Sequence, residues 1–285
     1  MTDKQFSIVL ALKNATHNEG TNNLERFARI GLPTYEKFMK KEDVAEFIIV
    51  CPMAEMEKIK QVTAVYEGWN WKIYGEEQLL HIGLRAGWAK QQTIKLAIAP
   101  LVKTGEYLII DDDTYLTRPF GYDNLRTKSG KLIMNRINID FPFFYLWSNQ
   151  ILDYDFDKVQ DFPVNMAITP EIFNTSVVRD LVKLLVTKYG SQKQWQLKLE
   201  QNKFTEYALY WIYLQMINKT DMYDLNEKSP QLYNYAITSN DQPLEKYIDL
   251  AFNDKKSPFY FSFVQSSTSY KVDEIYDVVK KYVDI

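Results

Sequence analysis

The sequence predicts an α/β fold built on a mostly parallel sheet that is flanked by helices. Up to residue 111, short apolar runs alternate with amphipathic segments in the order β-α-β-α-β-α-β. The apolar runs are nearly continuous, which is typical of strands buried on both faces. Connections in such sheets are right-handed, and ligands bind at the carboxyl ends of the strands.

The elements of the first part follow from their patterns. Asn22 or Asn23 can cap a first helix, which Pro33 is expected to interrupt, and Gly68 is expected to end the second. The expected strands cover 6–12, 46–52, 71–75 and 106–111. The expected helices cover 24–39, 53–68 and 87–105.

The second part lacks this alternation. We expect a turn and a strand over 121–135, irregular aromatic structure over 141–156, and a strand and turn over 162–173. Amphipathic helices are expected over 175–190, 203–218 and 272–285. We therefore predict one domain, 1–285, whose halves 1–120 and 121–285 share a cleft.

Bulk properties exclude several classes of protein. The net charge of −3 argues against a nucleic-acid partner, which would require a basic face. The one cysteine, Cys51, lies in an apolar run and is expected to be a buried filler, so no intrachain disulfide forms. The first apolar run is too short for a signal peptide and no later run could span a membrane, so we expect a cytoplasmic protein.

Three consecutive carboxylates, Asp111, Asp112 and Asp113, directly follow the fourth strand. They repel one another and lose solvation there, so the segment is either a solvated turn or a site for a cation. A phosphohydrolase of the haloacid dehalogenase type is another interpretation, with Asp111 as the nucleophile. Against it, Thr114 comes one residue too early, and that motif normally follows the first strand.

A third interpretation rests on two motifs together. The helix "GWAKQQTIKL" precedes "IIDDDTYLTRPF" at the spacing found in glycosyltransferases of the GT-A fold. The chain resembles glycogenin-like transferases and a bacterial and viral family with a GWxxQQxxKL helix before the Asp-x-Asp strand end. The resemblance implies a Rossmann-like GT-A fold, with a nucleotide-sugar-binding half, 1–120, and a helical acceptor-side half, 121–285.

The resemblance implies how the donor is bound. Asp113, with Asp111, would hold Mn²⁺ or Mg²⁺, which stabilises the charge on a departing nucleoside diphosphate. Arg85 and Lys95 suit its phosphates, although Lys95 could equally be a surface lysine. The full set of implied donor-binding residues is Ala11, Lys13, Asn14, Arg85, Gln91, Gln92, Lys95, Asp111, Asp112 and Asn165.

Glu206 is the expected catalytic carboxylate, although it could be an ordinary helix glutamate. It would be the general base of an inverting enzyme, or would position the sugar or stabilise the oxocarbenium-like state in a retaining one. Many GT-A enzymes complete the metal site with a C-terminal histidine, but His17 and His81 both precede the aspartates. Water, a further acidic residue, or a carboxamide or hydroxyl group from "FVQSSTSY", such as that of Gln265, would replace it.

The resemblance further implies a UDP-sugar donor, such as UDP-xylose, and a glycan acceptor. Rings of the second half, which otherwise pack in the core, could form an acceptor wall: Phe141, Phe143, Phe144, Tyr145 and Trp147. The rival from another class is a non-catalytic protein of the same fold that binds a nucleotide or a glycan.

Overall fold

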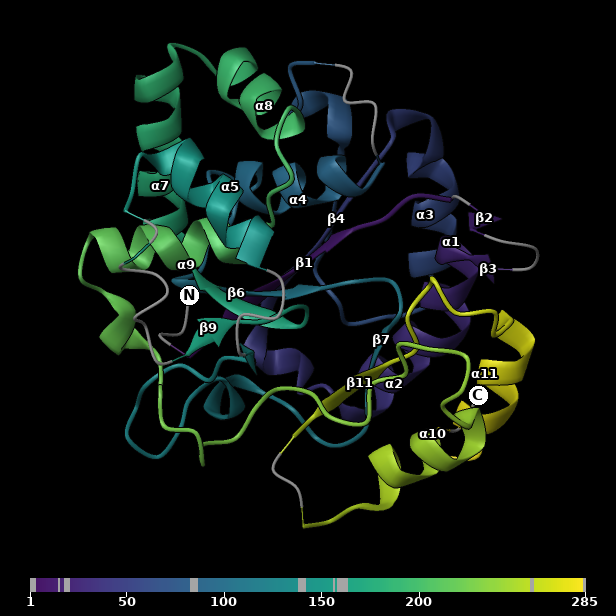
Figure 1. The fold of residues 1–285 in the computed structure, drawn as a ribbon. Helices are drawn as coiled ribbons and strands as arrows, with labels where there is room; N and C mark the ends of the chain where they lie inside the picture. Colours follow the sequence, from purple (N-terminus) through teal and green to yellow (C-terminus); the bar gives the residue numbers. More distant parts are fainter. Residues whose placement is uncertain are drawn as a thin grey trace.

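A five-stranded sheet forms the centre of the molecule (Figure 1). The computed structural model describes residues 4–14, 16–17, 21–82, 87–137, 142–155, 157, 164–256 and 259–283. The strand order is β10-β6-β1-β4-β5, in which only β10 is antiparallel to its neighbour. The strands are β1 (Phe6–Ala11), β4 (Val44–Cys51), β5 (Trp71–Gly75), β6 (Glu106–Ile110) and β10 (Glu171–Asn174).

The mostly parallel sheet flanked by helices confirms the predicted fold class. Val9 of β1 pairs with Ile48 on one side and with Ile109 on the other, and every residue of β1 is buried. The continuous apolar runs exist because helices cover both faces of these strands. Cys51 is buried as expected, and burial raises the pKa of its thiol to about 12.

Two groups of helices cover the sheet. In Figure 1, α4, α5, α7, α8 and α9 gather on one side, and α1, α2, α10 and α11 on the other. The first group is α4 (Gly87–Ala97), α5 (Pro142–Leu152), α7 (Thr175–Tyr189), α8 (Gln192–Glu200) and α9 (Glu206–Met216). The other α-helices in the described part of the chain are α1 (Asn23–Arg26), α2 (Leu32–Phe38), α3 (Met56–Thr63), α10 (Leu244–Asn253) and α11 (Val272–Val279).

The first predicted helix is not interrupted at Pro33. Asn22 caps it by accepting a hydrogen bond from the amide of Glu25, and a π-helical turn, Phe27–Gly31, joins α1 to α2. Pro33 lies in the first turn of α2. The wider π turn tolerates the missing proline N–H, so the chain stays helical.

Other boundaries differ from expectation. The irregular structure expected over 141–156 is wrong, because α5 begins at Pro142, a residue that suits a helix start. The helix expected over 87–105 ends at Ala97, since Pro100 cannot continue the helical hydrogen bonding. The helix expected over 53–68 ends at Thr63.

The C-terminal region returns to the first half of the chain. Strand β7 (Thr114–Leu116), just after the aspartates, pairs antiparallel with β11 (Phe261–Phe263). The other short pairs are β2 (Thr16–His17) with β3 (Thr21–Asn22), and β8 (Arg136–Ile137) with β9 (Asn165–Met166). Among the described residues, no helix is both long and apolar enough to cross a bilayer.

Candidate functional site

A cavity of about 410 Å³ opens at the carboxyl ends of the parallel strands. Its wall includes the end of β1, the end of β4, the first turns of α4 and the turn after β6. This is the edge at which the strand order predicts a ligand site. The predicted residues that line the cavity are Ala11, Lys13, Gln91, Gln92, Gln265 and all three consecutive aspartates.

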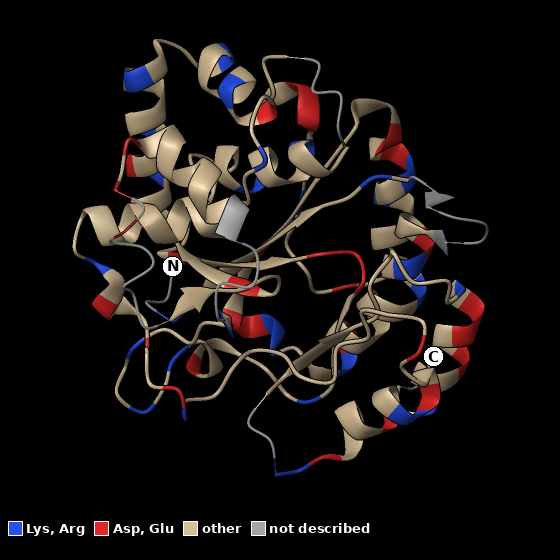
Figure 2. Cartoon of the chain, in the orientation of Figure 1, with Lys and Arg blue, Asp and Glu red and all other residues tan. Residues whose placement is uncertain are grey.

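The acidic segment forms a tight turn between β6 and β7, visible as a red stretch of chain in Figure 2. The Thr114 amide donates to the carbonyl of Asp111 at 3.1 Å. The Asp111 amide in turn donates to the Thr114 hydroxyl at 3.3 Å. These bonds keep the carboxylates at the cavity instead of in a flexible solvated loop.

The C-terminal segment holds Asp113. The Ser266 amide donates to Asp113 Oδ2 at 3.2 Å, and the Val264 amide donates to its main-chain carbonyl at 3.4 Å. Burial, followed by the charge of Asp111, raises the pKa of Asp113 to about 6. A cation in the cavity would relieve this repulsion.

Asp112 is the most buried of the three carboxylates. Its side chain is 6% exposed, and its Oδ2 atom has no hydrogen-bond partner among the described residues. Burial and the charge of Asp113 raise the pKa of Asp112 well above the ordinary value, and the buried Arg26 opposes this. Arg26 donates to the carbonyl of Val264 at 2.5 Å, so a fixed positive charge lies behind the turn.

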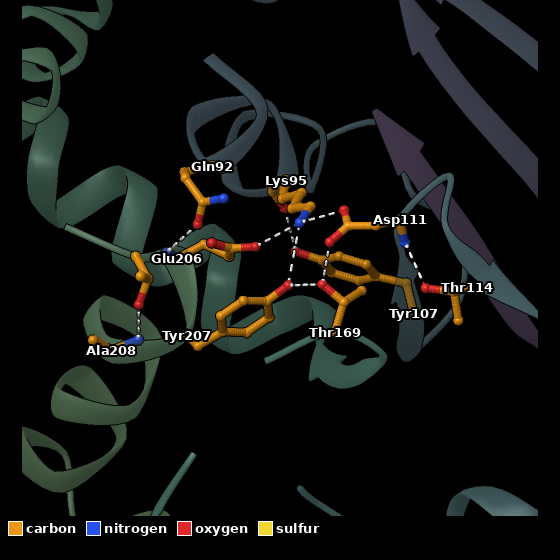
Figure 3. Close-up of polar contacts among 10 residues, drawn as sticks. Gln92, Lys95, Tyr107, Asp111, Thr114, Thr169, Glu206, Tyr207 and Ala208 are labelled. Carbon is orange, nitrogen blue, oxygen red and sulfur yellow. Dashed lines mark hydrogen bonds and ion pairs between the residues drawn. The ribbon is translucent and has the colours of Figure 1, made fainter. Parts of the chain in front are cut away.

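A buried ion cluster lies beneath Asp111 (Figure 3). Lys95 Nζ is 2.8 Å from Asp111 Oδ1 and 2.9 Å from Glu206 Oε1, and it donates to the Tyr207 hydroxyl at 3.1 Å. Lys95 is 1% exposed and Glu206 is fully buried, whereas the Asp111 side chain is 28% exposed. The Thr169 hydroxyl donates to Asp111 Oδ2. Both carboxylate oxygens of Asp111 therefore contact buried side chains.

Opposite charges stabilise the charged form of Lys95 in this cluster. Burial alone would lower the pKa of Lys95, but the carboxylates of Asp111 and Glu206 outweigh it and raise that pKa well above its usual value. Burial raises the pKa of Glu206, and Lys95 works against that increase. Gln92 reinforces the cluster by accepting a hydrogen bond from the Glu206 amide at 3.3 Å.

Several predicted site residues do not line the cavity. Lys95, Glu206 and Asn165 are at most 2% exposed and lie within the protein. The Asn14 side chain accepts a hydrogen bond from Asn22 at 2.8 Å. Arg85 lies outside the described residues.

Part of the cavity wall was not among the residues predicted from the sequence. Val50 and Glu76 lie at the ends of β4 and β5, so the rule that singled out the ends of β1 and β6 could have found them. Lys90 Nζ lies 2.6 Å from Glu76 Oε1. The other residues missed are Leu12, Asn23, Gly87, Trp88, Lys90, Ile94 and Ser266.

The donor set fits a divalent cation that takes further ligands from a substrate. Asp111, Asp113 and Gln265 line one cavity, and the carboxyl group of Asp112 lies beside them. Within the described part of the chain, no three His, Cys, Asp or Glu side chains are arranged to hold a metal alone. The side chain of His17 lies outside the described part, and His81 does not line the cavity.

The chain belongs to a family described as "Family of unknown function (DUF6492)", whose model matches residues 3–285. No curated protein matches the sequence. Two solved structures are similar at low identity. Mouse xyloside xylosyltransferase 1 in its apo form has a TM-score of 0.47 and 11% identity, over 91% of this chain and 97% of the mouse chain. The apo bifunctional glycosyltransferase WbbM has a TM-score of 0.47 and 12% identity, over 99% of this chain and 50% of its own.

Proposed function

We propose that the chain is a glycosyltransferase that moves a sugar from a nucleotide-sugar donor to a hydroxyl group of a glycan. The proposed donor is a UDP-sugar, such as UDP-xylose. The observation that carries the proposal is the cavity at the strand ends, which combines three aspartates with the glutamines of α4. Neutral amides suit sugar hydroxyls, and clustered carboxylates suit a cation beside a diphosphate.

In the proposed reaction, the acceptor oxygen forms a bond to the anomeric carbon while the bond from that carbon to the diphosphate breaks. The acceptor hydroxyl passes its proton to a base, which would be Glu206 in an inverting enzyme or an oxygen of the departing diphosphate in a retaining one. Asp111 and Asp113 would hold Mn²⁺ or Mg²⁺, which supplies positive charge to the leaving diphosphate. Lys13, at the cavity wall, would contact the nucleotide.

The predicted general base, Glu206, stays a prediction. Because its carboxylate is fully buried and ion-paired with Lys95, a positioning role is the better-supported alternative: Glu206 orients Lys95, which orients Asp111. The predicted phosphate contact of Lys95 likewise becomes a proposed positioning role. This arrangement preorganises a carboxylate at the place where the leaving group departs.

Thermal unfolding with a panel of nucleotide sugars, with and without Mn²⁺, tests the proposal. We expect one donor to raise the unfolding temperature, and to raise it further with Mn²⁺. When an acceptor glycan is added, we expect the nucleoside diphosphate of that donor to be released. Donor binding without turnover would favour the non-catalytic rival. Phosphate release from simple phosphoesters, with no response to any donor, would favour a phosphohydrolase.

A further inference from the structure

Trp88 is unusually exposed for its size. It lies in the first turn of α4, lines the cavity and is 46% exposed. Its ring centre is 5.6 Å from that of Phe144 on α5, with 38° between the ring planes. A large aromatic ring that opens onto a polar cavity is a common ligand contact.

Trp88 shares one face of α4 with the buried ion cluster. Trp88, Gln92 and Lys95 follow the spacing i, i+4 and i+7, which places them on one side of a helix. Lys95 contacts Asp111, and Gln92 contacts the start of α9. Along the axis of α4, Trp88 lies about 10 Å from Lys95. This face of the helix therefore extends from the carboxylate of Asp111, which Lys95 contacts, to the outer part of the cavity.

The two sides of the cavity differ in chemistry. Lys90 lies about 200° around the helix from Trp88, and it pairs with Glu76 at the end of β5. Trp88 instead contacts α5, which comes from the second half of the chain. The nucleotide is expected at the ends of β1 and β4, which leaves the Trp88 side for another ligand.

We propose that Trp88, backed by Phe144, is the platform on which a neutral sugar ring of the acceptor stacks. One face of a pyranose ring presents C–H groups that suit an aromatic face, while its hydroxyls remain at the ring edge. Gln91, on the same cavity wall, can hydrogen-bond such hydroxyls. This inference rests on the proposed function and adds the class of its second substrate.

Saturation-transfer NMR can test the platform with methyl β-D-glucopyranoside, methyl β-D-xylopyranoside, lactose and maltose as probes. We expect at least one probe to bind the wild type and Trp88→Phe, and to bind Trp88→Ala at least tenfold more weakly. Trp69→Phe is the matched control, because Trp69 packs on Trp71 and does not line the cavity. Trp69→Phe should bind the same probe with the affinity of the wild type.

Calorimetry with UDP and Mn²⁺ separates this inference from the proposed function. We expect Trp88→Ala to bind UDP within twofold of the wild type, which also shows that the variant is folded. A large loss of UDP affinity would assign the ring to the nucleobase and overturn the platform. Equal glycoside binding by Trp88→Ala, or no glycoside binding by a wild type that binds UDP, would also overturn it. Failure of the wild type to bind UDP counts against the proposed function instead.

Discussion

Lys95 of α4 and Glu206 of α9 form an ion pair 2.9 Å long in which both side chains are almost completely buried. The same ammonium group is 2.8 Å from Asp111 at the cavity. One buried cation therefore connects the packing of two helices to the orientation of a cavity carboxylate. This link makes the cluster testable through both stability and binding.

Replacing Lys95 by Met should destabilise the protein strongly. The methionine fills similar space but leaves Glu206 and Asp111 without their counter-charge. Removing one partner of a buried pair typically costs about 3–5 kcal/mol. Denaturant unfolding of Lys95→Met against the wild type measures this loss.

The double variant Lys95→Met/Glu206→Gln separates charge from shape. Glutamine is neutral and of similar size, and Asp111 remains partly exposed to water. We expect the double variant to regain more than half of the lost stability. A double variant as unstable as Lys95→Met would show that packing, and not charge, explains the loss.

Asn135 should be a second determinant of stability. Its fully buried amide donates to the carbonyl groups of Ile168 and Pro170, at 3.2 and 2.5 Å, and accepts from the Leu232 amide at 2.8 Å. Asn135→Ala leaves these main-chain groups unsatisfied, and we expect a loss of about 3 kcal/mol in unfolding experiments. Asn70→Ala is the control, because the exposed Asn70 side chain makes a single hydrogen bond within the described part of the chain, to the carbonyl of Ala45. Equal losses for both variants would contradict this prediction.

The raised pKa of Asp113 predicts a pH dependence. Because this pKa is about 6, the carboxylate gains a proton as the pH falls through 6 and then no longer attracts a cation. We expect the affinity for UDP with Mn²⁺ to fall about tenfold per pH unit below 6. Asp113→Asn should remove this dependence, and an unchanged pH profile in that variant would assign it to another group.

The raised pKa of Asp113 affects stability in the opposite direction: lowering the pH weakens ligand binding but increases the free energy of unfolding. The pKa of Asp113 in the folded state, about 6, lies above its ordinary value of 3.8, so between these values the folded protein binds more protons than the unfolded one. Without a cation, its contribution to stability therefore falls as the pH rises from 3.8 through 6. Unfolding measured at several pH values in a chelator should show this fall, and Asp113→Asn should lack it.

The parallel core was predictable because its signal is local. Each of the strands β1, β4 and β6 is a nearly continuous apolar run, a pattern typical of strands covered on both faces, whereas the edge strand β5 is only half-buried. The helix α5 was missed because its aromatic residues suggested no period, although Pro142 is a favourable first residue. The β7–β11 pair was not predictable, since two three-residue strands far apart in the chain carry no local signal.

The site was predictable where residues lie at strand ends and less so in its interior. The aspartates and Lys13 line one cavity, as the strand order suggested, and the glutamines of α4, which only the resemblance implied, line it too. The spacing on α4 could not show that Lys95 turns inward, because its two acidic partners come from different elements. Trp88 belongs to the motif "GWAKQQTIKL", but only its exposure and its contact with Phe144 distinguish it from a core residue.

The most direct test of the central claim is a calorimetric titration of the wild type and Asp113→Ala with UDP in the presence of Mn²⁺. Asp123→Ala is the matched control, because the Asp123 side chain is 77% exposed and pairs only with Lys4 among the described residues. The account predicts binding by the wild type and by Asp123→Ala, and a loss of at least tenfold in Asp113→Ala. Equal UDP affinity in all three proteins, or no binding by any of them, would contradict it.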